Sequence, residues 1–255
     1  MGLGRRAILV GLYARAYRHE PVARPLSGRY LSGFAVGVAL WLISLLVAPP
    51  ARFALWAAAM LVELATPLLS ASAVGRVPFH ASHVPERLAL FTIVVLGETV
   101  LLAVTGVGDL AGVHVAVAAI GFLVAACLWW SYFELVEGAP LQRGQVAWQV
   151  YLYGHLAIFA GITATGVGVQ LAAMTTSGEA LEPGPRWALC GGAATFYVAL
   201  SLVQPTVLRV ASALALVVLA AVTPGARPLL VEAVLLAVLV AHVALETAHP
   251  PRSKK

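Results

Sequence analysis

The sequence predicts an all-α membrane protein, a bundle of about eight transmembrane helices with both termini in the cytoplasm. Composition is the first reason, because 61% of the 255 residues are hydrophobic and 11% are charged, whereas soluble domains carry about 25% charged residues. The second reason is that the apolar residues form runs of about 17 to 25, the length of helix that crosses a bilayer. The third is that Lys and Arg lie between these runs, mostly on one predicted side.

Eight apolar runs have a length near this range, and residues that break helices separate them. The breaks include Pro49-Pro50, Pro183-Gly184-Pro185, Pro205 and Pro224-Gly225, where a proline interrupts no hydrogen bond within a span. The predicted spans are residues 30–47, 52–69, 86–106, 112–134, 146–172, 186–204, 207–222 and 227–246, of which the seventh is short.

Residues 1–29 precede the first span and form a basic segment. Its apolar stretch Ala7–Ala14 has about half the length that a span needs, and arginines flank it. The cleavage site of a secretory signal does not follow it. We expect an interfacial amphipathic helix there, or the inner end of a span. Residues 30–246 are then the transmembrane domain, and residues 247–255 are a basic cytoplasmic tail.

The distribution of basic residues sets the predicted orientation. With the N-terminus placed in the cytoplasm, only Arg52, Arg186 and Arg227 of the 16 Lys and Arg residues fall outside. Cytoplasmic loops of membrane proteins are enriched in Lys and Arg, so both termini are predicted to lie inside. Aromatic residues at 129–132 and 148–153 fall near the same predicted interface, as in an aromatic belt.

Composition and motifs also argue against several classes of function. The net charge of +5 comes from basic residues spread over short connections, which fits topology better than nucleic-acid binding. The sequence contains no phosphate-binding loop and no dinucleotide fingerprint. Cys127 and Cys190 fall inside predicted spans and are expected to be small buried apolar residues. We therefore expect no cofactor and no nucleic-acid partner.

Three titratable residues are predicted to lie near the middle of the membrane. At a rise of about 1.5 Å per residue, Glu63 lies about 16 Å from the outer end of its span, Glu98 about 18 Å from the inner end, and His155 about 13 Å from the inner end. These depths place Glu63, Glu98 and His155 at a similar level. We predict that they face one another and form a pathway for protons or substrate.

The cost of burying charge leaves several interpretations of these residues open. A charged group at the centre of a transmembrane helix costs roughly 2.5 to 3.5 kcal/mol. The two carboxyls must therefore stay protonated, pair with His155, or line water. The alternative is structural: a neutral acid or a histidine can form a hydrogen bond that joins two helices.

A second polar cluster stands where the third predicted span begins. His80, His83, Glu86 and Arg87 precede the apolar residues of this span and form a predicted cytoplasmic mouth. His80, His83 and Glu86 are three residues apart, so successive side chains turn by about 60° around a helix. A shared metal ion would need distortion, so we predict no metal site and instead a gate, or a structural cluster in which Arg87 balances Glu86.

The sequence from His80 to Gly106, HASHVPERLALFTIVVLGETVLLAVTG, resembles the signature of the bacterial low-temperature-requirement A (LtrA) family. Val62–Pro67 before it and Trp129–Glu134 after it fit the same pattern. The resemblance marks a set of positions in this sequence. They are Glu63, His83, Glu86, Arg87, Gly97, Glu98, Trp130, Tyr132 and Phe133.

The resemblance implies an all-helical protein of the bacterial inner membrane that is linked by name to growth in the cold, in a family without an established activity. Members usually begin with further spans that carry a segment like Glu-Leu-Phe-Phe-Asp-Leu-Val-Phe. This chain has no such segment and is expected to correspond to the C-terminal two-thirds of such a protein.

Two classes of function follow from these features. The first is a transporter of a small solute or ion, coupled to protons, because acids in mid-membrane on several helices are typical of carriers. The second is a protein without transport activity, either a membrane-homeostasis factor or an intramembrane enzyme that acts on lipid. The lipid bilayer is the expected partner in both cases, and self-association is left open.

Overall fold

The computed structural model of the chain describes residues 2–70, 83–106, 112–136, 144–175 and 178–249. These residues form helices joined by turns, and they contain no strand. The chain divides into two compact units, Met1–His80 and Ala81–Lys255, which are considered separately. The all-α bundle predicted from the sequence is confirmed.

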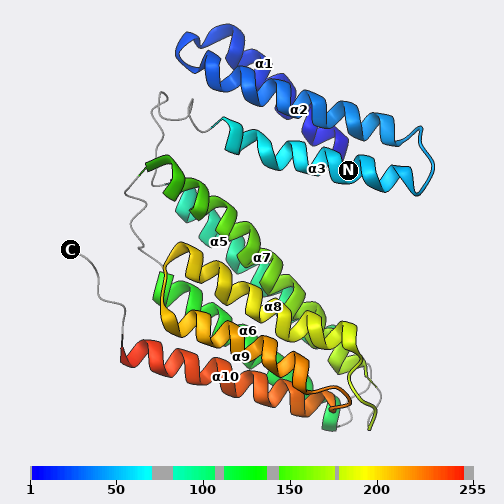
Figure 1. Cartoon of the computed structure of the whole chain (residues 1–255), viewed down its shortest axis with the longest axis vertical. Helices are drawn as coiled ribbons and strands as arrows, with labels where there is room; N and C mark the ends of the chain where they lie inside the picture. Colours follow the sequence, from blue (N-terminus) through cyan, green and yellow to red (C-terminus); the bar gives the residue numbers. More distant parts are fainter. Residues whose placement is uncertain (1, 71–82, 107–111, 137–143, 176–177, 250–255) are drawn as a thin grey trace. The chain divides into compact units, whose positions relative to one another are not determined.

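The described residues of the N-terminal unit form three α-helices, which lie side by side in Figure 1. They are α1 (Gly2–His19), α2 (Arg24–Ser44) and α3 (Ala51–Leu69), with a short 3-10 helix over Pro21–Ala23. Aromatic contacts hold α1 against α2: the rings of Tyr13 and Tyr30 stack with their centroids 5.1 Å apart. Helix α1 is therefore packed along α2.

Two glycines of α2 allow α3 to approach closely. A Cβ atom at Gly33 would collide with the side chain of Thr66, and one at Gly37 would lie 3.0 Å from Cγ of Glu63. Glycines four residues apart share one face of a helix and permit close packing in membranes. The GxxxG pattern of this segment thus makes room for a carboxyl side chain.

The described residues of the C-terminal unit form six helices, which pack into a bundle (Figure 1). Tightly packed pairs are α7 with α8, α8 with α9, α5 with α7, and α6 with α10. Its core consists of apolar residues from all six helices, including Leu128, Ile162, Phe196, Leu216 and Leu235. The helices are α5 (His83–Thr105), α6 (Gly112–Val136), α7 (Gly144–Met174), α8 (Pro183–Val203), α9 (Val207–Val222) and α10 (Pro228–Ala248).

Glycines also bring α7 and α8 into backbone contact. A Cβ atom at Gly161 would lie 2.6 Å from the backbone nitrogen of Phe196, and one at Gly192 would lie 2.5 Å from that of Thr165. Because transmembrane helices cannot associate by hydrophobic burial alone, such close packing supplies the attraction. The glycine-rich stretch of the fifth predicted span is a helix–helix contact.

Seven helices of the described part are long and apolar enough to cross a membrane, and α9 is a shorter apolar helix. The eight predicted spans correspond to α2, α3 and α5 to α10. With 16 residues, α9 is about 24 Å long, which is less than the hydrocarbon thickness of about 30 Å. Its ends therefore need internal hydrogen-bond partners.

Two buried arginines supply hydrogen bonds at the ends of α8 and α9. Arg209 Nη1 donates to the carbonyl oxygen of Gln204, at the end of α8, over 2.8 Å, and Arg186 Nη1 donates to that of Thr223, at the end of α9, over 3.0 Å. Cations are favourable at helix C-termini because free carbonyl groups give that end a partial negative charge. Arginine side chains thus join α8 and α9 by hydrogen bonds at both ends of the α8–α9 hairpin.

Candidate functional site

Glu63 has its partners within the N-terminal unit. Its carboxylate accepts hydrogen bonds from Arg6 Nε over 2.5 Å and from Arg6 Nη2 over 3.0 Å. Trp41 Nε1 donates to the same carboxylate over 3.0 Å, and the Arg6 guanidinium lies 4.8 Å from the centre of the Trp41 ring. A bidentate arginine with an aromatic face is a strong partner for a carboxylate, so Glu63 is held as an ion pair.

We expect Arg6→Gln and Glu63→Gln to be non-additive in their effects on stability. Each single variant leaves one charge without its partner, whereas the double variant leaves none, so the coupling free energy should be about 1 to 2 kcal/mol. Thermal unfolding of the four proteins in one detergent measures it. Additive losses would show that the pair contributes nothing.

Glu98 lies on the exposed side of α5, within about 6 Å of the middle of the helix along its axis. It forms no hydrogen bond or ion pair with any residue that the structure describes, and the neighbouring Gly97 has open space where a Cβ atom would stand. The next residue, Thr99, is buried, and its hydroxyl donates to the carbonyl oxygen of Ile162 on α7. Helix α5 therefore packs on its Thr99 side and presents Glu98 away from α7.

His155 lies in the packed core of the C-terminal unit. Its Nε2 is 2.9 Å from the Tyr132 hydroxyl on α6, and its Nδ1 is 2.7 Å from the carbonyl oxygen of Tyr151. Because a carbonyl oxygen only accepts, Nδ1 carries the proton and Nε2 accepts from Tyr132. Both ring nitrogens of His155 therefore have a hydrogen-bond partner when the imidazole is neutral.

The structure places the three predicted pathway residues in different surroundings. Glu63 belongs to one unit, and Glu98 and His155 belong to the other. Thr99 is level with Ile162, and His155 precedes Ile162 by seven residues, or about 10 Å along α7, so Glu98 and His155 do not touch. Their shared pathway stays a prediction.

The structure describes part of the predicted cytoplasmic mouth and the three aromatic residues that the family resemblance marks. His80 and the side chain of His83 lie outside the described residues, while Glu86 and Arg87 are exposed on the first turns of α5. Trp130 is exposed, Tyr132 is buried against His155, and Phe133 packs on the core. Among the described residues, no group of three or more His, Cys, Asp or Glu side chains is arranged to hold a metal ion.

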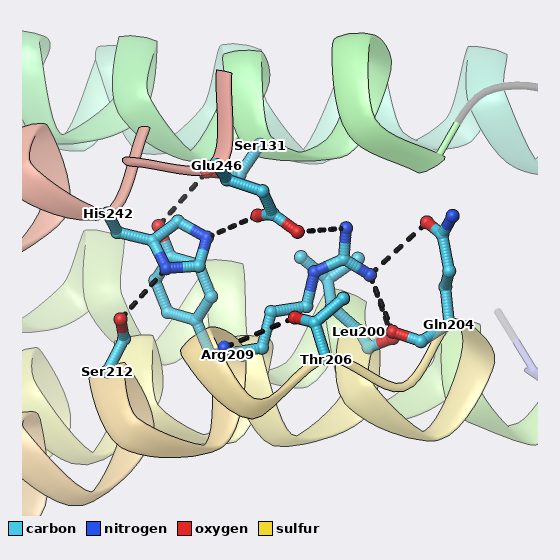
Figure 2. A network of polar contacts seen from close by, with 9 residues as sticks. Ser131, Leu200, Gln204, Thr206, Arg209, Ser212, His242 and Glu246 are labelled. Atoms are coloured by element: carbon cyan, nitrogen blue, oxygen red, sulfur yellow. Dashed lines mark hydrogen bonds and ion pairs between the residues drawn. The ribbon is translucent and has the colours of Figure 1, made fainter. Parts of the chain in front are cut away.

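A buried charge network on α8, α9 and α10 escaped the sequence analysis. Arg209 and Glu246 form an ion pair over 2.8 Å, with 0% and 2% of their side chains exposed. His242 Nε2 lies 2.7 Å from the other carboxylate oxygen of Glu246, and His242 Nδ1 lies 2.8 Å from the Ser212 hydroxyl. Figure 2 shows Glu246 between Arg209 and His242, with Ser212 beyond the imidazole.

The short contacts of this network fit a neutral histidine. In that form the Nε2–H of His242 lies against the Glu246 carboxylate, and Nδ1 accepts a hydrogen bond from the Ser212 hydroxyl. Arg209 and Glu246 then cancel each other's charge, as a buried pair must to offset its desolvation. Tyr197 extends the cluster, because its ring contacts that of His242, with the centroids 4.3 Å apart and the ring planes tilted by 57°, and its hydroxyl bonds to Ser131 on α6.

A hollow adjoins the network at the predicted cytoplasmic side. It has a volume of about 390 Å³ and lies between the start of α9 and the end of α10. Glu246 and His249 supply its titratable side chains, and the remaining walls are mostly apolar. The lining residues are Thr206, Val207, Leu208, Leu245, Glu246 and His249.

The sequence carried one usable signal for this network. His242 and Glu246 are four residues apart, so they lie on one face of a helix, yet both stand close to the end of the last span. The predicted topology places Arg209 among the cytoplasmic basic residues, whereas the structure buries its side chain completely. Residues near the end of a span are expected at the membrane interface, so the sequence did not indicate that these three side chains are buried.

The helices and their buried charges define a multi-pass α-helical membrane protein that contacts the lipid bilayer. Residues 3–248 match the sequence pattern of the family described as bacterial low temperature requirement A protein (LtrA). The chain belongs to this family, as the signature from His80 to Gly106 suggested.

A curated relative carries the name of an uncharacterized protein. An uncharacterized protein of Rhizobium meliloti (strain 1021) is 29% identical over 178 residues, which are 63% of this chain and 43% of the relative. The chain thus spans less than half the length of that protein. No solved structure matches the chain.

Proposed function

We propose that this protein is a proton-coupled carrier of a small solute or ion in the bacterial inner membrane. The observation that supports this proposal is Glu98, an exposed carboxyl near the middle of apolar α5 without a partner among the described residues. An ionised carboxylate is costly in hydrocarbon, so this side chain requires a proton, a cation or water. Exchange of these species at a mid-membrane acid is how many carriers couple transport to protons.

Other groups extend the proposed pathway. The Arg6–Glu63 ion pair and the Tyr132–His155 hydrogen bond each place an ionisable group inside an apolar helix bundle. Intramembrane ionisable residues of this kind commonly belong to proton relays. In this proposal His80, His83, Glu86 and Arg87 form the cytoplasmic mouth.

Transport assays with the purified protein in liposomes test the proposal. A pH-sensitive dye inside the vesicles reports proton movement when gradients of candidate ions and solutes are imposed. We expect Glu98→Gln, which keeps the shape but cannot ionise, to lower the coupled proton flux by about tenfold or more, as loss of a proton-transfer group does. Glu179→Gln is the matched control, because Glu179 is exposed in a turn outside the helices.

A Glu98→Gln protein that equals the wild type in every flux assay would contradict the carrier proposal. The alternative is then a membrane-homeostasis protein or an enzyme that acts on lipid. A change in extracted lipid species that disappears in the His83→Ala, Glu86→Gln double variant would support the enzyme. Without that change, the enzyme alternative has no support.

A further inference from the structure

Glu232 is a fully buried carboxyl on α10 that no sequence motif marks. Its side chain is 0% exposed, and neither carboxylate oxygen has a hydrogen-bond partner among the described residues. An ionised carboxylate without a partner is among the most costly groups to bury in a protein. A proton on Glu232 removes this cost.

Arg186 is a buried cation in the same region as Glu232, and one of its nitrogens has no hydrogen-bond partner among the described residues. Arg186 on α8 is 7% exposed, and its Nε has no hydrogen-bond partner among the described residues, while its Nη1 donates to Thr223. Arg186 and Glu232 both act electrostatically on Cys190 of α8, which places them in the same region. No ion pair within 4.0 Å joins the described atoms of Arg186 and Glu232.

The other charged and titratable groups around α10 lie elsewhere. At the same end, Arg227 and Glu182 are exposed to the outside of the bundle. Helices α6, α7 and α9 pack against α10, and α8 contacts it through Tyr197, whose ring lies against that of His242. The titratable groups of α6, α7 and α9 with described side chains stand nearer the opposite end. These groups are Cys127, Tyr132 and Glu134 on α6, Tyr151, Tyr153 and His155 on α7, and Arg209 on α9.

We propose that Glu232 is a proton-binding site in the predicted outer half of the bundle, and that Arg186 is the partner of its ionised form. A small movement of α8 against α10 brings the free Nε of Arg186 to the carboxylate. The proton leaves to solvent, and the buried negative charge is then balanced. This inference does not depend on the proposed transport, because proton binding is measurable in a protein that carries nothing.

Infrared spectroscopy of the purified protein in detergent tests the site. We expect the carbonyl band of a protonated carboxylic acid at about neutral pH, where an exposed glutamate is ionised, and we expect Glu232→Gln to remove it. Glu179→Gln, in the exposed turn before α8, should leave the band unchanged. A band that is absent from the wild type, or that persists in Glu232→Gln, overturns the site.

Stability against pH gives an independent measurement. A carboxyl that is protonated in the folded protein and ionised in the unfolded chain binds more protons when folded, so unfolding becomes easier as pH rises. Glu232→Gln removes this dependence. The apparent Tm of Glu232→Gln minus that of the wild type should therefore increase as the pH is raised from about 5 to about 8. A difference in Tm that is constant over this range contradicts a protonated Glu232.

Arg186→Gln tests the assignment of the partner. Without a guanidinium the ionised form of Glu232 loses its counter-charge, so the infrared band should persist to higher pH than in the wild type. Arg186→Lys keeps a positive charge, so the pH at which the band is lost should return part of the way to the wild-type value. A pH of band loss that stays the same in Arg186→Gln overturns the partner assignment and leaves the proton site intact.

Discussion

Arg209→Leu is expected to be the most destabilising single substitution in the charge network. It leaves Glu246 in the core with one buried charge and no arginine, and it removes the donor to the carbonyl groups of Leu200 and Gln204 at the end of α8. Removing one partner of a buried ion pair typically costs about 3 to 5 kcal/mol. The expected result is a protein that unfolds at a much lower temperature in detergent, or that fails to accumulate in membranes.

A double substitution separates the cost of the unpaired charge from the cost of losing the arginine side chain. Glu246→Leu combined with Arg209→Leu removes both charges, so we expect the double variant to be more stable than Arg209→Leu alone. Thermal unfolding followed by circular dichroism, on the wild type, both single variants and the double variant, measures the coupling. Single losses that simply add in the double variant would show that the ion pair does not couple α9 to α10.

Gly192→Ala is expected to have the second largest effect. The new Cβ atom would stand 2.5 Å from the backbone nitrogen of Thr165 and 2.9 Å from the carbonyl oxygen of Gly161. Because these are backbone atoms of α7, the clash with the new Cβ atom can be relieved only if α7 and α8 move apart. Overpacking of this kind typically costs about 1 to 3 kcal/mol and sometimes more. The same separation also weakens the close packing that holds transmembrane helices together.

The adjacent glycine is a matched control. A Cβ atom at Gly191 meets only the Trp187 ring, at an ordinary contact distance of 3.6 Å. Gly191→Ala should therefore leave stability unchanged or raise it by up to about 1 kcal/mol, because alanine favours the helix more than glycine does. Apparent Tm values of the two variants, compared in one detergent, check the prediction. Equal losses at both positions would mean that close α7–α8 contact is not what requires Gly192.

The positions of the spans could be predicted because they depend on local properties. A run of apolar residues must be long enough to cross the hydrocarbon, and a proline between runs ends a helix whatever surrounds it. The eight predicted ranges accordingly match α2, α3 and α5 to α10 within a few residues at most ends. The signature from His80 to Gly106 gave the family in the same way.

The partners of the charged residues could not be predicted from those properties. In a soluble helix the polar face marks the outside, but a transmembrane helix is apolar towards lipid and towards its neighbours. The sequence therefore does not reveal that Thr99 faces α7 while Glu98 faces away. Glu63 is bound by Arg6, which is 57 residues distant, and this pairing depends on the packing of α1 in the N-terminal unit.

The sequence by itself determined that this protein is an α-helical membrane protein of the LtrA family, with acids and a histidine inside its spans. Only the tertiary structure decided which of these groups are paired. It balances Glu63 with Arg6 and Glu246 with Arg209, and it gives Glu98 and Glu232 no cation among the described residues. The physical reason is that the cost of a charge in hydrocarbon depends on its nearest neighbours, and helix packing alone sets those neighbours.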